Sequence, residues 1–536
     1  MAILLTVFLV ALAWAYLRFK NIGSREPGLP RGPPTTPLLG NLGIFPKEYA
    51  YVKLTEWARI WGGIYSLKLG PSTAIVITDP VAVKELMDKR SRTTSSRPTN
   101  FIIESINGGL DLTLMSDNDT WRTLRKAAHT ILTPQMSAKH LPIQYAETTQ
   151  LLFDILRTPK DFYTHVQRYS NSVIMSVLYG KRCPRYESPE TTLFFTEQRE
   201  YLLLTEPGST PPLDFFPWLR YVPERWARWK TDVRRCRKLQ RNLFFGLLDE
   251  TRTRMERGEE NGSYMEDIIR RREELEMDRE MTGYLGGALL EGGSDTTSQF
   301  LHTMILAMII YSEVQQKAQA ELDRVVGPNR LPTLEDFPSL PYVQAIIRET
   351  HRIRPVAPLI PHASTDLEEY NGYLIPEGSI IFVNIWGIYH DPDIYNDPET
   401  FNPERYLQTE NGTRPGVDGS DLRPNLQFGC GRRICPGIHL AQNSINLVTM
   451  RLLWAFTFSR ATDPRNGKDI DVSLDLKNYS KGLITGPLPF KASITPRSSA
   501  TAETIEREFR DATDTFAKFE VGISQEDREF LEKYRR

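Results

Sequence analysis

Two cysteines share one short stretch, FGCGRRICPG at 428–437, in a 536-residue chain that holds only four cysteines. Cys430 and Cys435 do not have the C-x-x-C spacing of zinc or iron–sulfur sites, and Cys183 and Cys236 lie far away in the sequence. The eight histidines form no H-x-x-x-H pattern, so a His/Cys zinc site is not supported. A single thiolate can instead be the only protein ligand of a haem iron, because the porphyrin supplies the in-plane donors.

Cys435 has the surroundings that such a ligand needs. The loop must leave room for a flat macrocycle, bring positive charge to the haem propionates and shield the sulfur. Gly429 and Gly437 leave that room on either side of the cysteine. Arg433 can reach a propionate, and Phe428 can shield the sulfur. Cys430 has no comparable setting and is better interpreted as a structural thiol.

A second unusual stretch is GGSDTT at 292–297, inside the long apolar segment 282–312. Each glycine costs about 1 kcal/mol in a helix interior, and Ser, Asp and Thr compete for backbone hydrogen bonds. One interpretation is that a helix ends at Gly293 and the next is capped by Ser294 or Asp295. The other is a single helix with a weak point where a ligand approaches the backbone.

The first stretch fits F-x-x-G-x-R-x-C-x-G, the haem-binding signature of cytochromes P450, so the chain resembles that family. The resemblance implies haem b as cofactor, with the Cys435 thiolate as its iron ligand. GGSDTT resembles the oxygen-activation stretch of the family's long central helix, which favours the single-helix interpretation. Asp295 and Thr296 would then be the catalytic pair that relays protons during oxygen activation.

Three further motifs follow in the family's order. ETHR at 349–352 and FNPERY at 401–406 resemble the family's K-helix and P-E-R-F motifs, and imply a buried structural network of Glu349, Arg352 and Arg405. E-x-x-R also occurs elsewhere in the chain as an ordinary i, i+3 pair, so the motif has meaning only in this context.

The remaining haem contacts come from WRTLR at 121–125 and from PLIPHAS. WRTLR resembles the family's C helix, which implies that Trp121 and Arg125 pair with a haem propionate. An ordinary amphipathic helix has the same pattern. His362 stands where the family often has an arginine or histidine for the other propionate.

The resemblance covers roughly residues 30–495 and implies one large, mainly α domain with small β-sheets, although length alone favours two domains. Strands are predicted within 64–78 and 368–384. We predict a membrane anchor at 1–20, a stiff proline-rich hinge at 21–42 that acts as a spacer, and the catalytic domain at 43–495. The charged extension at 496–536 is expected to form one or two exposed helices.

The N-terminal segment has no charge in residues 1–17, and Arg18 and Lys20 follow directly. Positive charge after the apolar run holds that flank in the cytosol, which predicts an endoplasmic reticulum membrane protein with its catalytic domain facing the cytosol. A cleaved signal peptide is the alternative, but it favours charge before the apolar run.

The resemblance implies a monooxygenase that inserts one atom of O2 into a lipophilic small molecule, with a role in fungal secondary metabolism. The formal net charge of −1 argues against nucleic acid as a partner. The chain has no flavin or nicotinamide fingerprint, so electrons would come from a separate NADPH–cytochrome P450 reductase docked near Arg122, Lys126 and Arg432. A haem-thiolate enzyme that rearranges peroxides without reductase, and a haem-binding sensor, are the alternatives.

By the same resemblance, apolar residues from four segments are candidates to contact substrate. They are Phe101, Ile102, Ile103, Leu289, Val356, Leu359, Ile360, Leu483 and Ile484.

Overall fold

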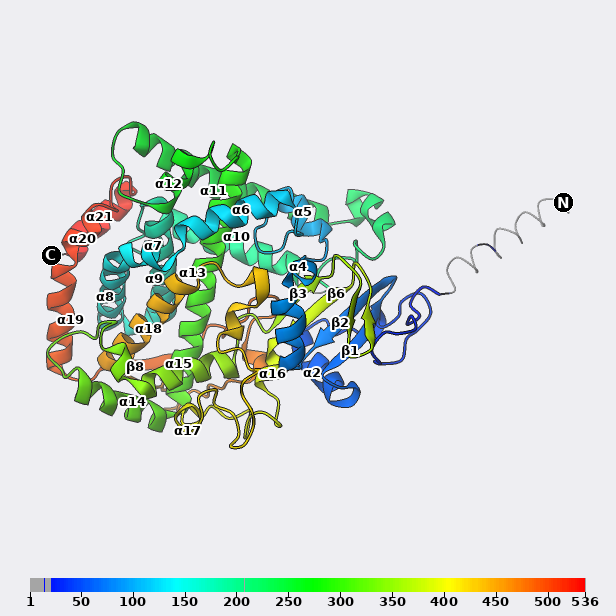
Figure 1. Ribbon diagram of the computed structural model, residues 1–536. Coiled ribbons are helices and arrows are strands. Elements are labelled where there is room, and N and C mark those ends of the chain that lie inside the picture. The colour runs from blue at the N-terminus through cyan, green and yellow to red at the C-terminus, as the bar shows by residue number, and fades with distance from the viewer. Residues whose placement is uncertain (1–13, 15–20, 207, 536) are drawn as a thin grey trace.

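The computed structural model describes residues 14, 21–206 and 208–535. Helices form most of the body, and the four-stranded sheet lies towards one end of it, at the right of Figure 1. The predicted class, mainly α with small β-sheets, is confirmed. The longer helices are α8 (Leu141–Arg157), α9 (Phe162–Tyr179), α10 (Pro189–Thr205), α11 (Trp229–Glu256), α13 (Arg279–Ile310), α14 (Ser312–Val325) and α18 (Ile438–Ala455).

Shorter helices connect these elements and surround the sheets. They are α2 (Ala50–Trp61), α3 (Pro80–Ala82), α4 (Ser91–Thr94), α5 (Phe101–Asn107), α6 (Asp119–Ile131), α7 (Pro134–Lys139), α12 (Tyr264–Arg271), α15 (Pro341–Ile353), α16 (Ile385–Tyr389) and α17 (Arg405–Gln408).

The strands form one sheet of four and two separate hairpin-like pairs. In the larger sheet the order is β1-β2-β6-β3, with β2 and β6 parallel and the other neighbours antiparallel. The predicted Asn-Gly turn joins β4 to β5, with positive φ at both Asn371 and Gly372 as such a turn requires. The strands are β1 (Ile64–Leu69), β2 (Ser72–Ile77), β3 (Leu359–Ala363), β4 (Glu368–Tyr370), β5 (Tyr373–Ile375), β6 (Ile380–Asn384), β7 (Phe456–Arg460) and β8 (Ala492–Pro496).

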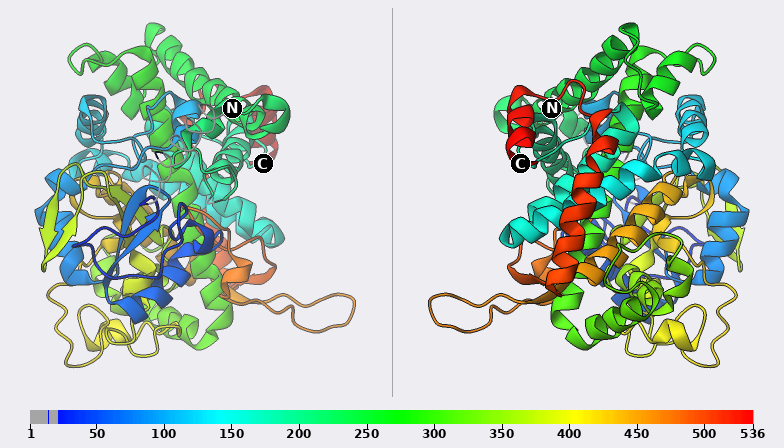
Figure 2. Two further views of the ribbon diagram at one scale, coloured as in Figure 1. Left: turned by 90° about the vertical axis from the view of Figure 1, so that its right-hand side faces the viewer. Right: turned by 90° about the vertical axis from the view of Figure 1, so that its left-hand side faces the viewer.

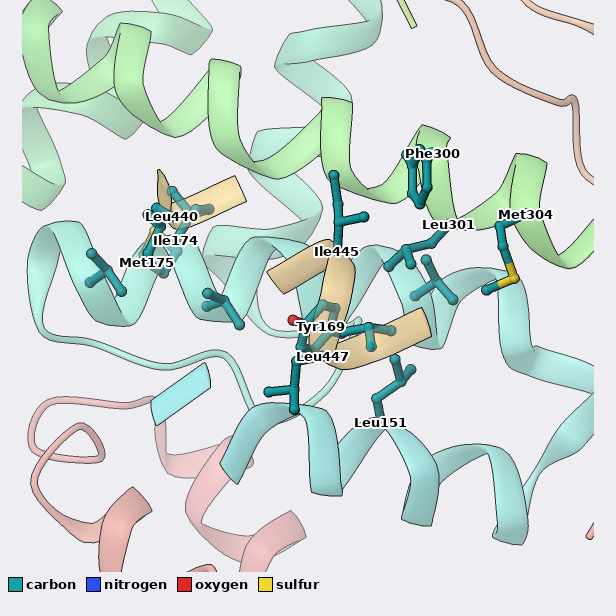
Figure 3. Packing of buried hydrophobic residues seen from close by; sticks show 14 of the residues in the cluster. Leu151, Tyr169, Ile174, Met175, Phe300, Leu301, Met304, Leu440, Ile445 and Leu447 are labelled. Atoms are coloured by element: carbon teal, nitrogen blue, oxygen red, sulfur yellow. The ribbon is translucent and has the colours of Figure 1, made fainter. Parts of the chain in front are cut away.

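Helix α13 runs without interruption through GGSDTT, so the interpretation of two capped helices is wrong. Its glycines are positions of close helix packing. A Cβ on Gly287 would lie 2.2 Å from the Phe244 ring, and one on Gly293 would lie 2.6 Å from Ile174. Burial of the apolar half of the helix offsets the cost of these glycines. Figure 3 shows that half packed towards α18 and α9.

The proline-rich stretch is docked on the sheet, so the prediction of a spacer is wrong. Asn41 is fully buried and its amide donates to the Pro34 carbonyl at 2.8 Å. Buried Lys68 of β1 reaches back to Glu26 at 2.6 Å. The proline content indicates only that the stretch is locally stiff, so it could not predict that the stretch packs against the sheet.

The predicted anchor at 1–20 lies outside the described residues except for Trp14. Within the part of the chain that is described, no helix combines the length and apolar character needed to cross a membrane.

The C-terminal extension is helical as predicted, but it is not exposed. Helices α19 (Ser499–Asp511), α20 (Thr513–Ala517) and α21 (Gln525–Tyr534) lie along one side of the body (Figure 2). Phe509 stacks on Phe153 of α8 with ring centroids 4.1 Å apart. Buried Arg182 pairs with Glu520 at 2.7 Å, and its guanidinium covers the Phe516 ring. The extension therefore completes the core around α8.

Replacing Phe509 with alanine should lower the free energy of unfolding by about 3–5 kcal/mol, because it leaves a cavity against Phe153. Urea denaturation of the full chain measures this loss. Glu503, exposed on the same helix, is the matched control, and Glu503→Ala should change stability by less than about 0.5 kcal/mol. Equal stability of the two variants would show that the extension is only loosely attached.

Candidate active site

The loop that carries Cys435 is held rigidly ahead of α18. The Cys435 backbone N–H donates to the Phe428 carbonyl at 2.8 Å. Gly431 has φ +57°, and a Cβ there would lie 2.1 Å from the Met87 carbonyl, so only glycine fits. Its N–H donates to Asp88 at 2.8 Å. These contacts fix the path of the backbone on both sides of the thiol.

The two cysteines of this loop differ in their surroundings. Burial raises the pKa of the Cys435 thiol, but a Gly437 backbone N–H and the positive charge of Arg125 oppose that shift. Cys430 is 1% exposed, and burial raises its pKa to about 12. The Gly437 N–H and the Arg125 charge favour the thiolate of Cys435, whereas burial favours the thiol, so iron ligation by this thiolate stays a prediction from the sequence.

Phe428 connects the loop to the helices behind it. Its ring meets His351 of α15 edge-on at 5.7 Å, and His351 in turn packs on Phe300 of α13 at 4.4 Å. Gly429 has φ +83°. A Cβ added to it would lie 3.5 Å from its nearest neighbour, the carbonyl oxygen of Arg433. The Phe428 ring thus links the loop to α15, and its predicted role in shielding the sulfur stays a prediction.

Three arginines converge beside the loop: Arg97 and Arg433 are buried, and Arg125 is half-buried. Burial, together with the charge of its neighbours, lowers the pKa of Arg433 to about 9 and that of Arg97 to about 10. Burial also lowers the pKa of Arg125. Their hydrogen bonds go to backbone carbonyls, such as Arg433 to Ser95 at 2.8 Å and Arg97 to Thr113 at 2.9 Å. The negative charges of Asp111 and Asp117 oppose the effect of burial on Arg97 and Arg433 without reversing it. Because no carboxylate of the described residues forms a salt bridge with these guanidinium groups, their positive charge is only partly offset.

His362 of β3 lies next to this cluster. It is 1% exposed, and neither of its ring nitrogens has a hydrogen-bond partner. Burial, with the charges of Arg97 and Arg433, holds its pKa well below the usual value. A ligand with carboxylates would satisfy both the arginines and this imidazole. The residues present therefore fit the propionates of a haem whose iron meets Cys435.

Trp121 does not present a free N–H to a propionate, which corrects that prediction. Its Nε1 donates to the Leu112 carbonyl at 3.2 Å. Its ring instead lies under the Arg433 guanidinium, 3.8 Å from the centroid. Trp121 thus positions Arg433 through a cation–π contact. Arg97 was missed by the sequence analysis, because a lone arginine in a loop gives no periodic or motif signal.

The oxygen-activation stretch of α13 has the expected open backbone. Thr296 Oγ1 donates to the Gly292 carbonyl at 2.6 Å. Gly292 is exposed, and a Cβ on it would meet nothing within 4 Å. The helix thus presents a glycine and a hydroxyl to open space.

Asp295 is 4% exposed, and its partners are amides. Gln299 Nε2 donates to it at 2.9 Å, and Gln198 Nε2 of α10 lies 3.5 Å from its other oxygen. Burial raises its pKa, which favours the protonated form. Neither glutamine was singled out from the sequence, since Gln198 comes from a distant helix.

The predicted structural network is formed. Arg352 makes a bidentate pair with Glu349, with both N–O distances 2.8 Å, and Arg405 lies 3.2 Å from the same carboxylate. Arg352 also donates to the carbonyls of Tyr389 and Pro398 at 2.8 Å. The network ties α15 to the segment that precedes the cysteine loop.

Several predicted substrate contacts are brought together. The Thr485 N–H donates to the Val356 carbonyl at 2.8 Å, and Gly486 packs closely on Gln299 of α13. These contacts join three segments that are far apart in sequence. The half-buried candidates on them and on β3 are Leu289, Val356, Leu359, Ile360, Leu483 and Ile484.

The candidates on α5 are placed differently. Ile102 is 4% exposed and packs in an apolar cluster with Ile106 and Tyr201, so its predicted substrate contact is wrong. Ile103 is also buried. Phe101 is half-buried against Trp229, with ring centroids 6.0 Å apart. On so short a helix, the spacing of apolar residues cannot distinguish those that pack in the core from those that line the substrate site.

Replacing Cys435 with alanine should abolish the thiolate type of haem absorption, because no other described thiol has donors of this kind. The absorption difference between the reduced protein with and without carbon monoxide measures this. Cys430→Ala is the matched control and should leave the spectrum unchanged. Identical spectra for wild type and Cys435→Ala would exclude Cys435 as the ligand.

Comparison with known proteins agrees with this geometry. The family description "Cytochrome P450" matches residues 30–480. A cytochrome P450 monooxygenase of Armillaria gallica is 43% identical over 94% of this chain and 96% of its own length, and one of Aspergillus niger is 41% identical over 90% and 92%. A zebrafish cytochrome P450 crystallised with progesterone superposes with a TM-score of 0.68 at 24% identity, over 83% of this chain and 99% of its own. This chain belongs to the cytochrome P450 family.

Proposed function

We propose that this protein is a haem-thiolate monooxygenase that inserts one oxygen atom from O2 into a lipophilic small molecule. The observation that carries this function is Cys435, held beside three arginines and an unpartnered histidine that fit haem propionates. Its fungal relatives are cytochrome P450 monooxygenases, which supports a role in fungal secondary metabolism.

The haem would be held by Cys435 at the iron and by Arg97, Arg125, Arg433 and His362 at the propionates. When bound, thiolate-ligated haem supplies oxygen activation, because electron density from the sulfur favours O–O cleavage. The polypeptide supplies the rest: apolar side chains exclude water and place the substrate over Gly292.

Asp295 and Thr296 supply protons. Burial raises the pKa of Asp295 while the N–H donors of Gln299 and Gln198 oppose that shift, which suits a carboxyl that takes up and releases a proton. The Thr296 hydroxyl, anchored on the Gly292 carbonyl, would be the last donor on the helix. This pair counts against a peroxide-rearranging enzyme, which needs no proton relay. NADPH consumption that depends on an organic substrate would separate a monooxygenase from a haem sensor.

Electrons would come from NADPH–cytochrome P450 reductase. Arg122, Lys126 and Arg432 are exposed, and Arg432 lies in the cysteine loop itself. These positive charges favour docking of an acidic partner close to the sulfur side of the haem. Turnover that did not weaken as the salt concentration rises would argue against this docking.

Membrane association, with the body on the cytosolic side of the endoplasmic reticulum, is a further part of the proposal. Trp218, Tyr221 and Trp226, between α10 and α11, are 66%, 86% and 70% exposed. Aromatic side chains of this kind are enriched at membrane interfaces. The same segment packs near the N-terminal region, since Phe216 lies against Gly70. An anchor before residue 21 and this aromatic segment would meet one lipid surface.

Asp295→Asn should lower reductase-coupled product formation by about 10²–10⁴-fold, because the amide cannot donate the acid proton. Since burial raises the Asp295 pKa, the wild-type rate should fall as pH rises through that raised pKa, and the variant should lack this decrease. Product and NADPH are measured with O2 and a library of lipophilic compounds. An unchanged rate and pH profile, at equal haem content, would remove Asp295 from the mechanism.

Trp218 and Trp226 should enter lipid when the full chain is reconstituted in phospholipid vesicles, because both rings are exposed on one segment. Lipids brominated on their acyl chains should quench part of the tryptophan fluorescence. The Trp218→Phe/Trp226→Phe variant should lose that part. Equal quenching in both proteins would show that this segment stays in water.

A further inference from the structure

Two glutamates face each other across the helices above the oxygen-activation stretch. Glu197 of α10 is fully buried, and its Oε2 has no hydrogen-bond partner. Glu291 of α13 accepts a hydrogen bond from Gln240 Nε2 of α11 at 3.1 Å, and the buried Gln240 Oε1 has no partner either. The charges that act on this pair are acidic: Asp111 acts on both glutamates, and Glu197 acts on Glu291.

Three buried glutamates elsewhere in the fold are paired with arginines. Glu147 pairs with Arg168 and Arg182, Glu349 with Arg352 and Arg405, and Glu266 with Arg254. A buried carboxyl without a cation is costly, and an apolar side chain of similar size would usually be as stable or more so. Glu197 and Glu291 therefore stabilise the fold poorly, which points to a partner outside the polypeptide.

The position of Glu291 suggests what that partner is. Glu291 is half-buried and directly precedes Gly292, the exposed glycine with open space above it. The half-buried Leu289, a predicted substrate contact, lies two residues earlier on the same helix. Glu291 thus lies at the edge of the space in which the proposed reaction occurs, and Glu197 and Gln240 lie behind it.

We propose that Glu291 determines substrate specificity by hydrogen bonding to a hydroxyl group of an otherwise apolar substrate, with Gln240 and Glu197 positioning its carboxyl. The unpartnered atoms behind it are oxygen acceptors, which need a donor such as a hydroxyl. Burial raises both pKa values, and nearby acidic charge adds to the shift: Asp111 at Glu197, and Glu197 with Asp111 at Glu291. The pair therefore favours its uncharged form, which suits a hydroxyl better than an ammonium group. The hydroxyl would fix which end of the substrate faces Gly292 and Thr296.

This inference rests on the proposed monooxygenase function, and ligand binding to the resting holoenzyme tests it without turnover. The probes are three matched pairs: β-naphthol, para-butylphenol and geraniol, each with its methyl ether. A permanently charged probe, naphthylmethyl-trimethylammonium, tests for a cation site. Dissociation constants come from the shift of haem absorption on binding.

Wild type should bind at least one hydroxyl compound about tenfold more tightly than its ether, the difference expected for one good hydrogen bond. Glu291→Leu should reduce this ratio to about one, and Glu291→Gln should keep part of it. The matched control, Glu280→Gln, removes an acid from an exposed pair with Arg241 on the same helix and should leave the ratio unchanged.

Thermal unfolding separates specificity from a structural role. Glu291→Leu should be at least as stable as wild type, because it removes an uncompensated acid. No hydroxyl preference in any pair, a preference that survives Glu291→Leu, or tightest binding of the ammonium probe would each overturn the inference. If one of these contrary results came with normal haem loading and turnover, the proposed monooxygenase function would still stand. If the hydroxyl preference were as expected but no substrate were turned over, the proposed function would be overturned and the inference about Glu291 would not.

Discussion

Excess positive charge beside Cys435, only partly offset by Asp111 and Asp117, is the constraint on which the rest of the site depends. Arg97, Arg125 and Arg433 come from three separate segments and are all drawn into one buried region. Isolated buried charge is costly, so these arginines are stable there only with an anionic partner. A dicarboxylate cofactor supplies it, and its binding energy then becomes folding energy for the loops that hold it. Binding of the cofactor and folding of these loops are therefore thermodynamically coupled.

The Glu349 network shows the opposite arrangement. Its two arginines neutralise one carboxylate, and the remaining N–H groups meet backbone carbonyls. Because every charge is satisfied within the polypeptide, this network can hold α15 and the approach to the cysteine loop before any cofactor binds. The two regions therefore differ in charge balance. The charges of the Glu349 network are neutralised within the polypeptide, whereas the arginines beside Cys435 need an anionic ligand.

The same distinction explains how much was predictable from the sequence. Cys435, Glu349 and the Asp295–Thr296 pair were identified because their motifs are local and their order along the chain is informative. Gln198, Gln240 and Arg97 could not be identified, because each acts on a residue brought close only by tertiary packing. The fold class was predictable from helical periodicity and turn signals. The docking of the proline-rich stretch was not, since its partner is a strand some forty residues away.

The structure of the C-terminal extension was only partly predictable from the sequence. Ile505 and Phe509 are one turn apart on a charged helix, which indicates one buried face, yet the many charges around them suggested exposure. The spacing of the apolar residues predicts the burial of this helix better than its charge content does. One face of a helix can be buried while charged side chains on the opposite face stay in solvent. For helices of this kind, the periodicity of a few large apolar residues says more than the charge content.

Helices α10 and α13 bring three acidic side chains together with amides and no arginine, beside a region where arginine is used freely. A cation near Asp295 would lower its pKa and favour loss of the proton that the reaction needs. Amides hold the same carboxyl in place without that effect. Keeping cations away from this part of the two helices would serve two purposes in the proposed reaction: it leaves the pKa of Asp295 raised, and it favours the uncharged form of Glu291 that would bond a neutral hydroxyl.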